Sequence, residues 1–184
     1  MGFGTIFATI AMVVLIGISS YLFITGALFT VDTLSKSLKI ANELDNEQLK
    51  TEIEIVNVSV TTSNSDSGSS DINVSINNTG STKILKSEFK HIDVFVYYHN
   101  HTAAGENITI HRWIPYNDTD YAALQPNEWT VVEITPDLIN PGTFDPDEQM
   151  RIVIRVEPAI NSTKQNGNWT KIVMPNGVSA SKYF

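Results

Sequence analysis

The residues whose types could do chemistry are few, and none of them completes a site. His99 and His101 form a His-x-His pair that could begin a metal site, but such a site needs further ligands from elsewhere in the chain. Asp145, Asp147 and Glu148 resemble part of a calcium loop, yet the alternating ligands and central glycine of an EF-hand are missing. We therefore predict solvated histidines, a simple acidic turn, and no metal or other cofactor.

Motifs for nucleophilic or phosphate chemistry are also incomplete. Gly2-Phe3-Gly4 begins like a phosphate-binding fingerprint, but Phe7 occupies the position of the third glycine. The chain has no cysteine and no Gly-x-Ser-x-Gly nucleophile elbow. The sequence therefore predicts a protein that is not an enzyme.

One chemical signal does recur, the Asn-x-Ser/Thr triplet that accepts N-linked glycans. Eight such triplets occur, none with proline in the middle, and they begin at Asn57, Asn73, Asn77, Asn100, Asn107, Asn117, Asn161 and Asn168. Two of these asparagines fall on the solvent face of one predicted strand. The triplets make each asparagine a candidate glycosylation site outside the cell, although Asn, Ser and Thr also simply fill turns and exposed strand positions.

The N-terminal segment is apolar and carries no charge before Asp32. About 20 apolar residues span the hydrocarbon core of a bilayer, so residues 1–31 are predicted to form a transmembrane helix or an equally apolar polymer core. A cleavable signal would have a basic start and a shorter apolar run, so we expect the segment to remain on the mature protein. Its membrane or polymerisation residues are Phe3, Ile6, Phe7, Ile10, Met12, Val13, Leu15 and Ile16.

Residues 32–50 are predicted to continue the helix as a stalk. Apolar side chains recur at alternating spacings of four and three, as in an amphipathic or coiled-coil helix, at Ala27, Val31, Leu34, Leu38 and Ala41. A helix from about residue 3 to 49 would be about 70 Å long. The alternative is a plain anchor with a frayed polar tail.

Residues 51–184 change to a period of two, which is typical of strands with one buried and one wet face. Turn residues separate seven or eight such runs, at 53–60, 71–77, 92–98, 108–110, 129–134, 150–156 and 172–174. We predict a mainly β fold, an immunoglobulin-like antiparallel β-sandwich, preceded by the transmembrane helix. Trp113 and Trp129 lie in alternating runs and are expected at or beside the core.

Composition narrows the choice of partners. The chain has 20 acidic and 12 basic residues and a formal charge of −8. This negative charge argues against binding of nucleic acid and against attraction to anionic lipid headgroups. The chain has no cysteine, so no disulfide supports the predicted sandwich. Its roughly 130 residues are enough to bury one hydrophobic core without that support.

The first helix resembles a known family. Gly4-Thr5, followed after four residues by Ile10-Ala11-Met12-Val13, is similar to the N-terminal polymerisation helix of archaellins, the subunits of the archaeal motility filament. Pre-archaellins carry a short basic leader before this helix, whereas Met1-Gly2-Phe3 opens the chain without a basic residue. That start resembles the archaellum accessory proteins F and G, particularly stator protein F.

The resemblance implies a structural stator component of the archaellum motor. Such a protein has a single-pass anchor in the cell membrane and an external sandwich, beneath or in the S-layer, that binds the S-layer protein. We also expect contacts with other archaellum subunits. We further expect a homodimer or homo-oligomer, joined through an unpaired edge strand. The alternatives are an archaellin or pilin-like subunit of the extracellular filament, and a glycosylated adhesin or solute-binding domain without a role in motility.

Overall fold

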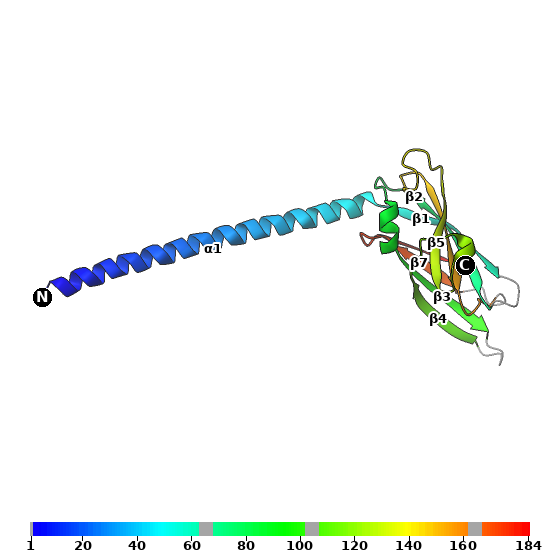
Figure 1. Cartoon of the computed structure of the whole chain (residues 1–184), viewed down its shortest axis with the longest axis horizontal. Helices are drawn as coiled ribbons and strands as arrows, with labels where there is room; N and C mark the ends of the chain where they lie inside the picture. The colour runs from blue at the N-terminus through cyan, green and yellow to red at the C-terminus, as the bar shows by residue number, and fades with distance from the viewer. Residues whose placement is uncertain (1, 63–67, 102–106, 162–166) are drawn as a thin grey trace. The chain divides into compact units, whose positions relative to one another are not determined.

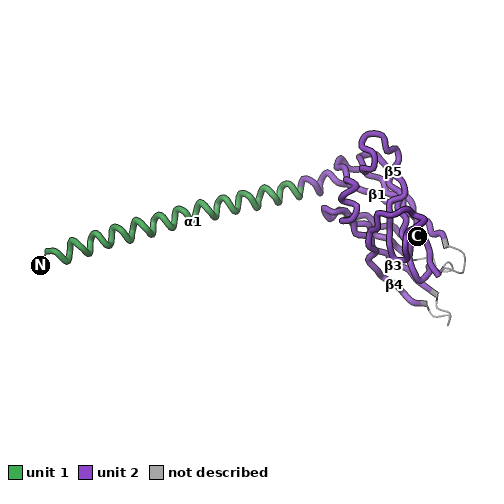
Figure 2. The backbone as a smooth tube through the Cα atoms, viewed as in Figure 1, with its two compact units in different colours: residues 1–45 green, residues 46–184 purple. Residues whose placement is uncertain are grey.

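The structure is a computed structural model that describes residues 2–62, 68–101, 107–161 and 167–184. The chain divides into two compact units, Met1–Asp45 and Asn46–Phe184 (Figure 2). Its elements in order are α1 (Phe3–Lys50), β1 (Ile53–Thr62), β2 (Ser70–Asn78), η1 (Lys86–His91), β3 (Asp93–His101), β4 (Asn107–Ile114), η2 (Tyr121–Ala123), β5 (Glu128–Thr135), β6 (Gln149–Val156), β7 (Trp169–Val173) and β8 (Ser179–Tyr183) (Figure 1).

Helix α1 is continuous over 48 residues, and the helix contains no glycine or proline after Gly26. Threonine side chains of its apolar part bond within the helix: Thr25 Oγ1 donates to Tyr21 O at 2.8 Å and Thr30 Oγ1 to Gly26 O at 2.9 Å. Such back-bonding satisfies hydroxyl groups without water, so the threonines do not oppose an apolar surrounding. Among the described residues, α1 is the one helix long and apolar enough to cross a membrane.

The second unit is a sandwich of two four-stranded antiparallel sheets, ordered β1-β2-β6-β5 and β4-β3-β7-β8. This order corresponds to strands A-B-E-D and C′-C-F-G of an immunoglobulin-type sandwich. The predicted fold class is therefore confirmed. The sequence gives no clear signal for β8, because Ser179–Tyr183 has little apolar alternation.

The core lies between the two sheets and is filled by alternate residues of the strands. Ile72, Val74 and Ile76 of β2 are fully buried, as are Val94 and Val96 of β3. The residues between them, Asn73, Ser75 and Phe95, are partly exposed on the opposite face, because successive side chains of a strand point to opposite faces. The period-two runs therefore predict the core correctly for these strands.

The two tryptophans that were expected at or beside the core differ in burial. Trp129 is fully buried, which confirms its placement. Trp113 is 50% exposed, so its predicted core position is wrong. The reason is the register of β4, whose inward positions are the even-numbered Ile110 and Ile114. Trp113 points outward, and its Nε1 donates to Asp93 Oδ1 at 2.8 Å.

Tyr98 is buried in the core without a hydrogen-bond partner for its hydroxyl among the described residues. Burial raises its pKa to about 12. We predict that Tyr98→Phe raises the free energy of unfolding by about 1 kcal/mol, because it removes a desolvated, unpaired hydroxyl. Urea unfolding of residues 46–184 measures this change, with Tyr97→Phe as the solvent-facing control. A loss of stability in Tyr98→Phe would show that the hydroxyl has a partner.

Candidate functional site

The apolar part of α1 is uncovered. None of its described residues is buried, and all eight predicted membrane or polymerisation residues are more than half exposed: Phe3, Ile6, Phe7, Ile10, Met12, Val13, Leu15 and Ile16. Residues 3–31 form about 43 Å of helix, enough for a hydrocarbon core of about 30 Å. This surface requires lipid or other apolar helices around it, because a helix that is apolar on every side is stable only when buried.

Three of the predicted glycosylation sites share the outer face of the β1-β2 pair. Asn57 of β1 is exposed, and Asn73 and Asn77 of β2 are partly exposed. Strand register places all three on the face away from the core. The face is a solvent surface on which attached glycans would not disturb the core, and their presence stays a prediction.

The other five sites differ in their exposure and in their hydrogen bonds. Asn100 is partly exposed at the end of β3, Asn107 has a side chain outside the described residues, and Asn117 donates from Nδ2 to Glu128 Oε2 at 2.8 Å. Asn161 and Asn168 are buried.

Asn168 is unsuited to glycosylation in the folded protein. It is fully buried, and its Oδ1 accepts a hydrogen bond from the backbone N–H of His99 at 3.1 Å. A glycan on this amide would have to displace the surrounding side chains. The triplet pattern missed this because burial at the start of β7 depends on contacts with β3, far away in the sequence.

Several of the residues considered for metal binding have other partners. Among the described residues no group of three or more His, Asp or Glu side chains could hold an ion. His99 Nδ1 lies 3.2 Å from Thr109 Oγ1, and the His101 side chain is outside the described residues. Glu148 Oε2 accepts from the Asp145 N–H at 2.9 Å, so the acidic turn before β6 binds its own backbone.

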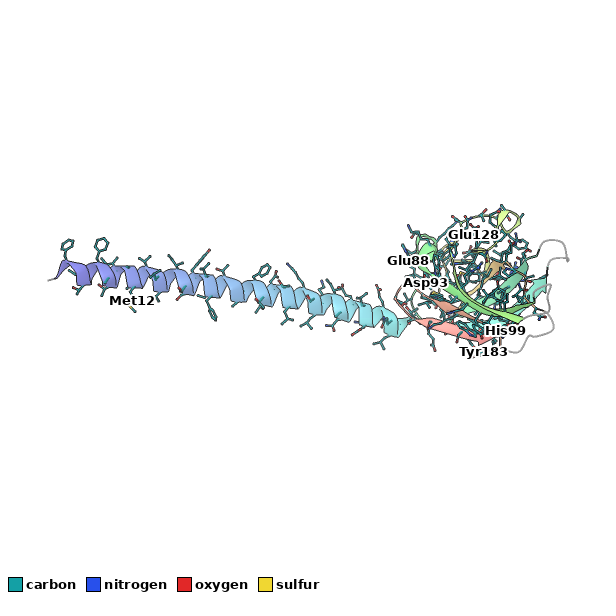
Figure 3. The ribbon with its side chains drawn as sticks, turned by 90° about the horizontal axis from the view of Figure 1, so that it is seen from below. Met12, Glu88, Asp93, His99, Glu128 and Tyr183 are labelled. Atoms are coloured by element: carbon teal, nitrogen blue, oxygen red, sulfur yellow. The ribbon has the colours of Figure 1, made fainter. Side chains whose placement is uncertain are left out.

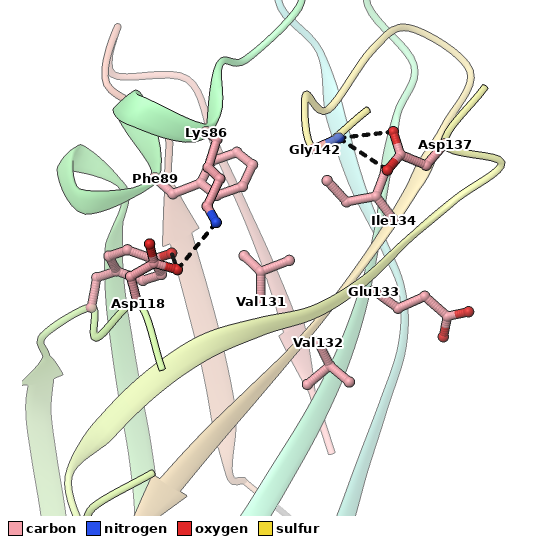
Figure 4. Close-up of a pocket in the computed structure, with 10 residues that line it drawn as sticks. Lys86, Phe89, Asp118, Val131, Val132, Glu133, Ile134, Asp137 and Gly142 are labelled. Carbon is pink, nitrogen blue, oxygen red and sulfur yellow. Dashed lines mark hydrogen bonds and ion pairs between the residues drawn. The ribbon is translucent and has the colours of Figure 1, made fainter. Parts of the chain in front are cut away.

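A groove of about 350 Å³ lies beside β5 and contains charged groups (Figure 4). Its lining includes Phe89, Val131, Ile134 and the charged residues Lys86, Asp118, Glu133 and Asp137. Each carboxylate has a partner: Asp118 pairs with Lys86 at 3.5 Å, Glu133 pairs with Arg151 at 3.0 Å, and Asp137 accepts from the Gly142 N–H. The Lys86–Asp118 and Asp137–Gly142 contacts hold loops in place, and the Glu133–Arg151 pair joins β5 to β6.

A buried ion pair fixes the segment around η2 to the outer face of β2 and β6. Arg155 Nε donates to Asp71 Oδ1 at 2.8 Å, and Tyr121 Oη donates to Asp71 Oδ2 at 2.8 Å. Arg155 Nη1 also donates to Leu124 O at 2.6 Å. Burial by itself raises the pKa of Asp71, but the hydrogen bonds from Arg155 and Tyr121, with the charge of Arg155, hold it below its ordinary value of 3.8.

The edge strands of the β1-β2-β6-β5 sheet are both irregular. Register shifts lie between Ile55 and Asn57 in β1 and between Val131 and Glu133 in β5. Lys182 of β8 also donates to Val56 O at 2.7 Å. Bulges and covering charges blunt a sheet edge against pairing with another chain, so these edges are poor templates for the expected edge-to-edge homodimer.

The outer face of the β4-β3-β7-β8 sheet is aromatic. Register places His111, Tyr97, Trp169 and Tyr183 in one row across the four strands. The Tyr97 and Trp169 rings are parallel within 3°, with centroids 5.7 Å apart, and His111 lies 5.4 Å from Trp169. Asp93 and His99 belong to the same face, and Figure 3 labels them together with Tyr183. This face was not predicted from the sequence, although large rings occur at alternate positions of β3 and β4.

The chain is similar to several archaeal proteins. An uncharacterized protein of Archaeoglobus fulgidus is 30% identical over 185 residues, which cover 100% of this chain and 96% of that protein. The archaellum periplasmic stator protein FlaG of Sulfolobus acidocaldarius aligns with 73% of this chain and 99% of its own, at 20% identity and a TM-score of 0.44. The archaeal flagellum structure of Methanospirillum hungatei covers 99% of this chain and 91% of its own, at 14% identity and a TM-score of 0.46.

A match to one protein family covers the apolar helix and the sandwich together. It extends over residues 1–184 and is to the archaeal-type flagellin family. The resemblance of the first helix to archaellum proteins is thereby confirmed at the level of the family. Because the match includes every part of the chain, the protein belongs to the archaeal-type flagellin family.

Proposed function

We propose that this protein is a structural stator component of the archaellum motor. Residues 1–31 anchor it in the cell membrane, and the sandwich lies outside the cell and binds the S-layer protein. The observation that carries the proposal is the uncharged apolar part of α1, in which no described residue is buried, in a member of the archaeal-type flagellin family. Such a surface needs a lipid or helical surrounding, while the sandwich has its own core.

The physical role of such a component is to resist torque. A rotor that turns a filament also turns the motor body, unless the body is held to a fixed structure. A membrane helix joined to a wall-binding sandwich provides that connection. The apolar seam of the predicted stalk, residues 32–50, is exposed at Leu34 and Leu38 and offers a contact for other archaellum subunits or a second copy of the chain.

The second candidate is a subunit of the filament itself. The family match supports it, because that match includes the helix that filament subunits would pack together. An apolar surface on all sides of α1 suits a polymer core as well as a bilayer. The two candidates differ in where the helix resides after assembly.

Deletion of the gene in its host distinguishes the two candidates. For a stator component we expect cells that still carry filaments by electron microscopy but fail to swim, because the rotor lacks a fixed reaction point. For a filament subunit we expect filaments to be missing or shortened. A complementing copy of the whole gene is the control, and normal swimming after deletion would contradict both candidates.

A second measurement tests the proposed partner. The fragment of residues 46–184 should retain purified S-layer protein in a pull-down, and should not retain purified filaments. Retention of filaments alone would favour the filament subunit.

A further inference from the structure

The outer face of the β4-β3-β7-β8 sheet differs in charge from the rest of the protein. The chain carries a formal charge of −8, yet Asp93 is the one carboxylate that the described register places on this face. Asp93 already accepts a hydrogen bond from Trp113 Nε1 at 2.8 Å. Lys171, opposite Phe95, forms no ion pair within the described part of the chain. An anion is therefore the complementary charge for this face.

A small slot in the face lies beside this lysine. It has a volume of about 170 Å³ and is lined by Trp169, Lys171, Ser181 and Tyr183. Pockets for drug-sized ligands occupy roughly 300–1,000 Å³, so this slot accepts a single ring. Two of its walls are aromatic, and the other two residues present an ammonium group and a hydroxyl.

We propose that this face binds an anionic saccharide. One sugar ring enters the slot between Trp169 and Tyr183, and its carboxylate or sulfate group accepts a hydrogen bond from Lys171 Nζ. Ser181 pairs with a ring hydroxyl. The neighbouring rings of Tyr97 and His111 extend the platform across the sheet, over about 14 Å at the usual spacing of strands, so that adjoining sugars also contact the face.

The mixture of groups favours a saccharide over a protein. The centre of a protein interface is depleted of charged residues, whereas here Lys171, Ser181 and two histidines are interleaved with the rings. A sugar can contact both the polar side chains and the aromatic rings. Its hydroxyls donate and accept hydrogen bonds, and the polarised C–H bonds on one side of its ring pack against the negative face of an aromatic ring.

Most of the chain's own candidate glycosylation sites lie away from the row of His111, Tyr97, Trp169 and Tyr183. Asn57, Asn73 and Asn77 lie on the outer face of the other sheet. Asn107 is the one triplet asparagine that the described register assigns to the aromatic face, and it lies opposite His101 at the start of β4, four residues from His111. The inference does not depend on the stator role, because the face is the same in a filament subunit.

The test uses the full chain in micelles of a zwitterionic detergent, which has no sugar headgroup to compete. The probes are a glucuronate-containing oligosaccharide, a sulfated one and a neutral glucose oligosaccharide of equal length, with polyglutamate as a non-sugar polyanion. Binding is measured by calorimetry and by tryptophan fluorescence. The variants are Lys171→Gln and Tyr183→Ala, and their matched controls are Lys83→Gln and Leu138→Ala, which change exposed residues outside the face.

We expect the wild-type chain to bind at least one anionic saccharide more tightly than the neutral one, and more weakly as salt is added. Each variant should lose about tenfold or more in affinity, as expected for one charge-assisted hydrogen bond or one stacking contact, while the controls bind normally. The carboxylate and sulfate probes identify the anion. Absence of saccharide binding, equal binding of polyglutamate, or an equal loss in Lys83→Gln would overturn the proposal. Swimming and filament number are separate readouts, so failure here leaves the proposed function untouched.

Discussion

Replacing Trp129 by alanine is expected to lower the free energy of unfolding of the sandwich by about 3–5 kcal/mol, the usual cost of deleting a fully buried large side chain. Trp129 is fully buried, and its ring centroid is 4.7 Å from that of Tyr116. Its backbone also holds the segment before η2, because the Trp129 N–H donates to Pro115 O at 3.0 Å and Trp129 O accepts from the Asn117 N–H at 2.9 Å. A smaller side chain leaves a cavity beneath that segment.

Trp113→Ala is the matched control, because it removes the same side chain from the outer face. Its indole is 50% exposed and makes one hydrogen bond, to Asp93. We expect a loss of only about 1 kcal/mol, the usual net value of such a bond. Urea unfolding of residues 46–184, monitored by circular dichroism, compares the two variants. Equal losses would show that the assignment of the two faces of the sandwich is wrong.

Periodicity predicts this fold well where one face of a strand is clearly more apolar than the other. In β2, Ile72, Val74 and Ile76 alternate with Asn and Ser, and the buried face is evident. In β4, apolar or aromatic side chains occur on both faces, at Ile110 and at Trp113. A period of two identifies a strand there but does not say which face is buried, and that is why Trp113 was misplaced.

The candidate sites depend on pairings that no local pattern contains. The row of His111, Tyr97, Trp169 and Tyr183 comes from four strands, and it exists only because of their register. Burial of Asn168 likewise follows from its contact with β3. The apolar surface of α1 is different, because it depends only on the residue types of one continuous segment. Those residue types can be read directly from the sequence.

The ion pair of Asp71 and Arg155 is another such pairing, and its disruption is the second large effect that we expect. Arg155→Met should cost about 3–5 kcal/mol at neutral pH, because it leaves a buried carboxylate without its cation. The Asp71 and Arg155 side chains are 6% and 20% exposed. The equivalent change Arg151→Met, also on β6, breaks an ion pair with Glu133 of β5, and these two side chains are 41% and 55% exposed. It should cost only about 0–1 kcal/mol.

The pH dependence separates a lost ion pair from general damage to the packing. In the native protein the pKa of Asp71 is below its ordinary value of 3.8, so the unfolded chain binds more protons as the pH falls through this region. The pair therefore stabilises the fold above about pH 4, and its contribution is lost as the pH falls through the lowered pKa. In Arg155→Met, burial dominates and raises the pKa of Asp71.

That reversal changes the sign of the slope. As the pH falls toward 4, the native state of Arg155→Met should take up a proton before the unfolded chain does, and the stability contributed by this site should rise. Replacing both partners, as Asp71→Leu with Arg155→Met, should recover much of the loss, because no buried charge remains. Urea unfolding of residues 46–184 between pH 3 and 7 measures both effects. Parallel pH profiles for wild type and Arg155→Met would mean that Asp71 is solvated, and that the segment around η2 is held by packing alone.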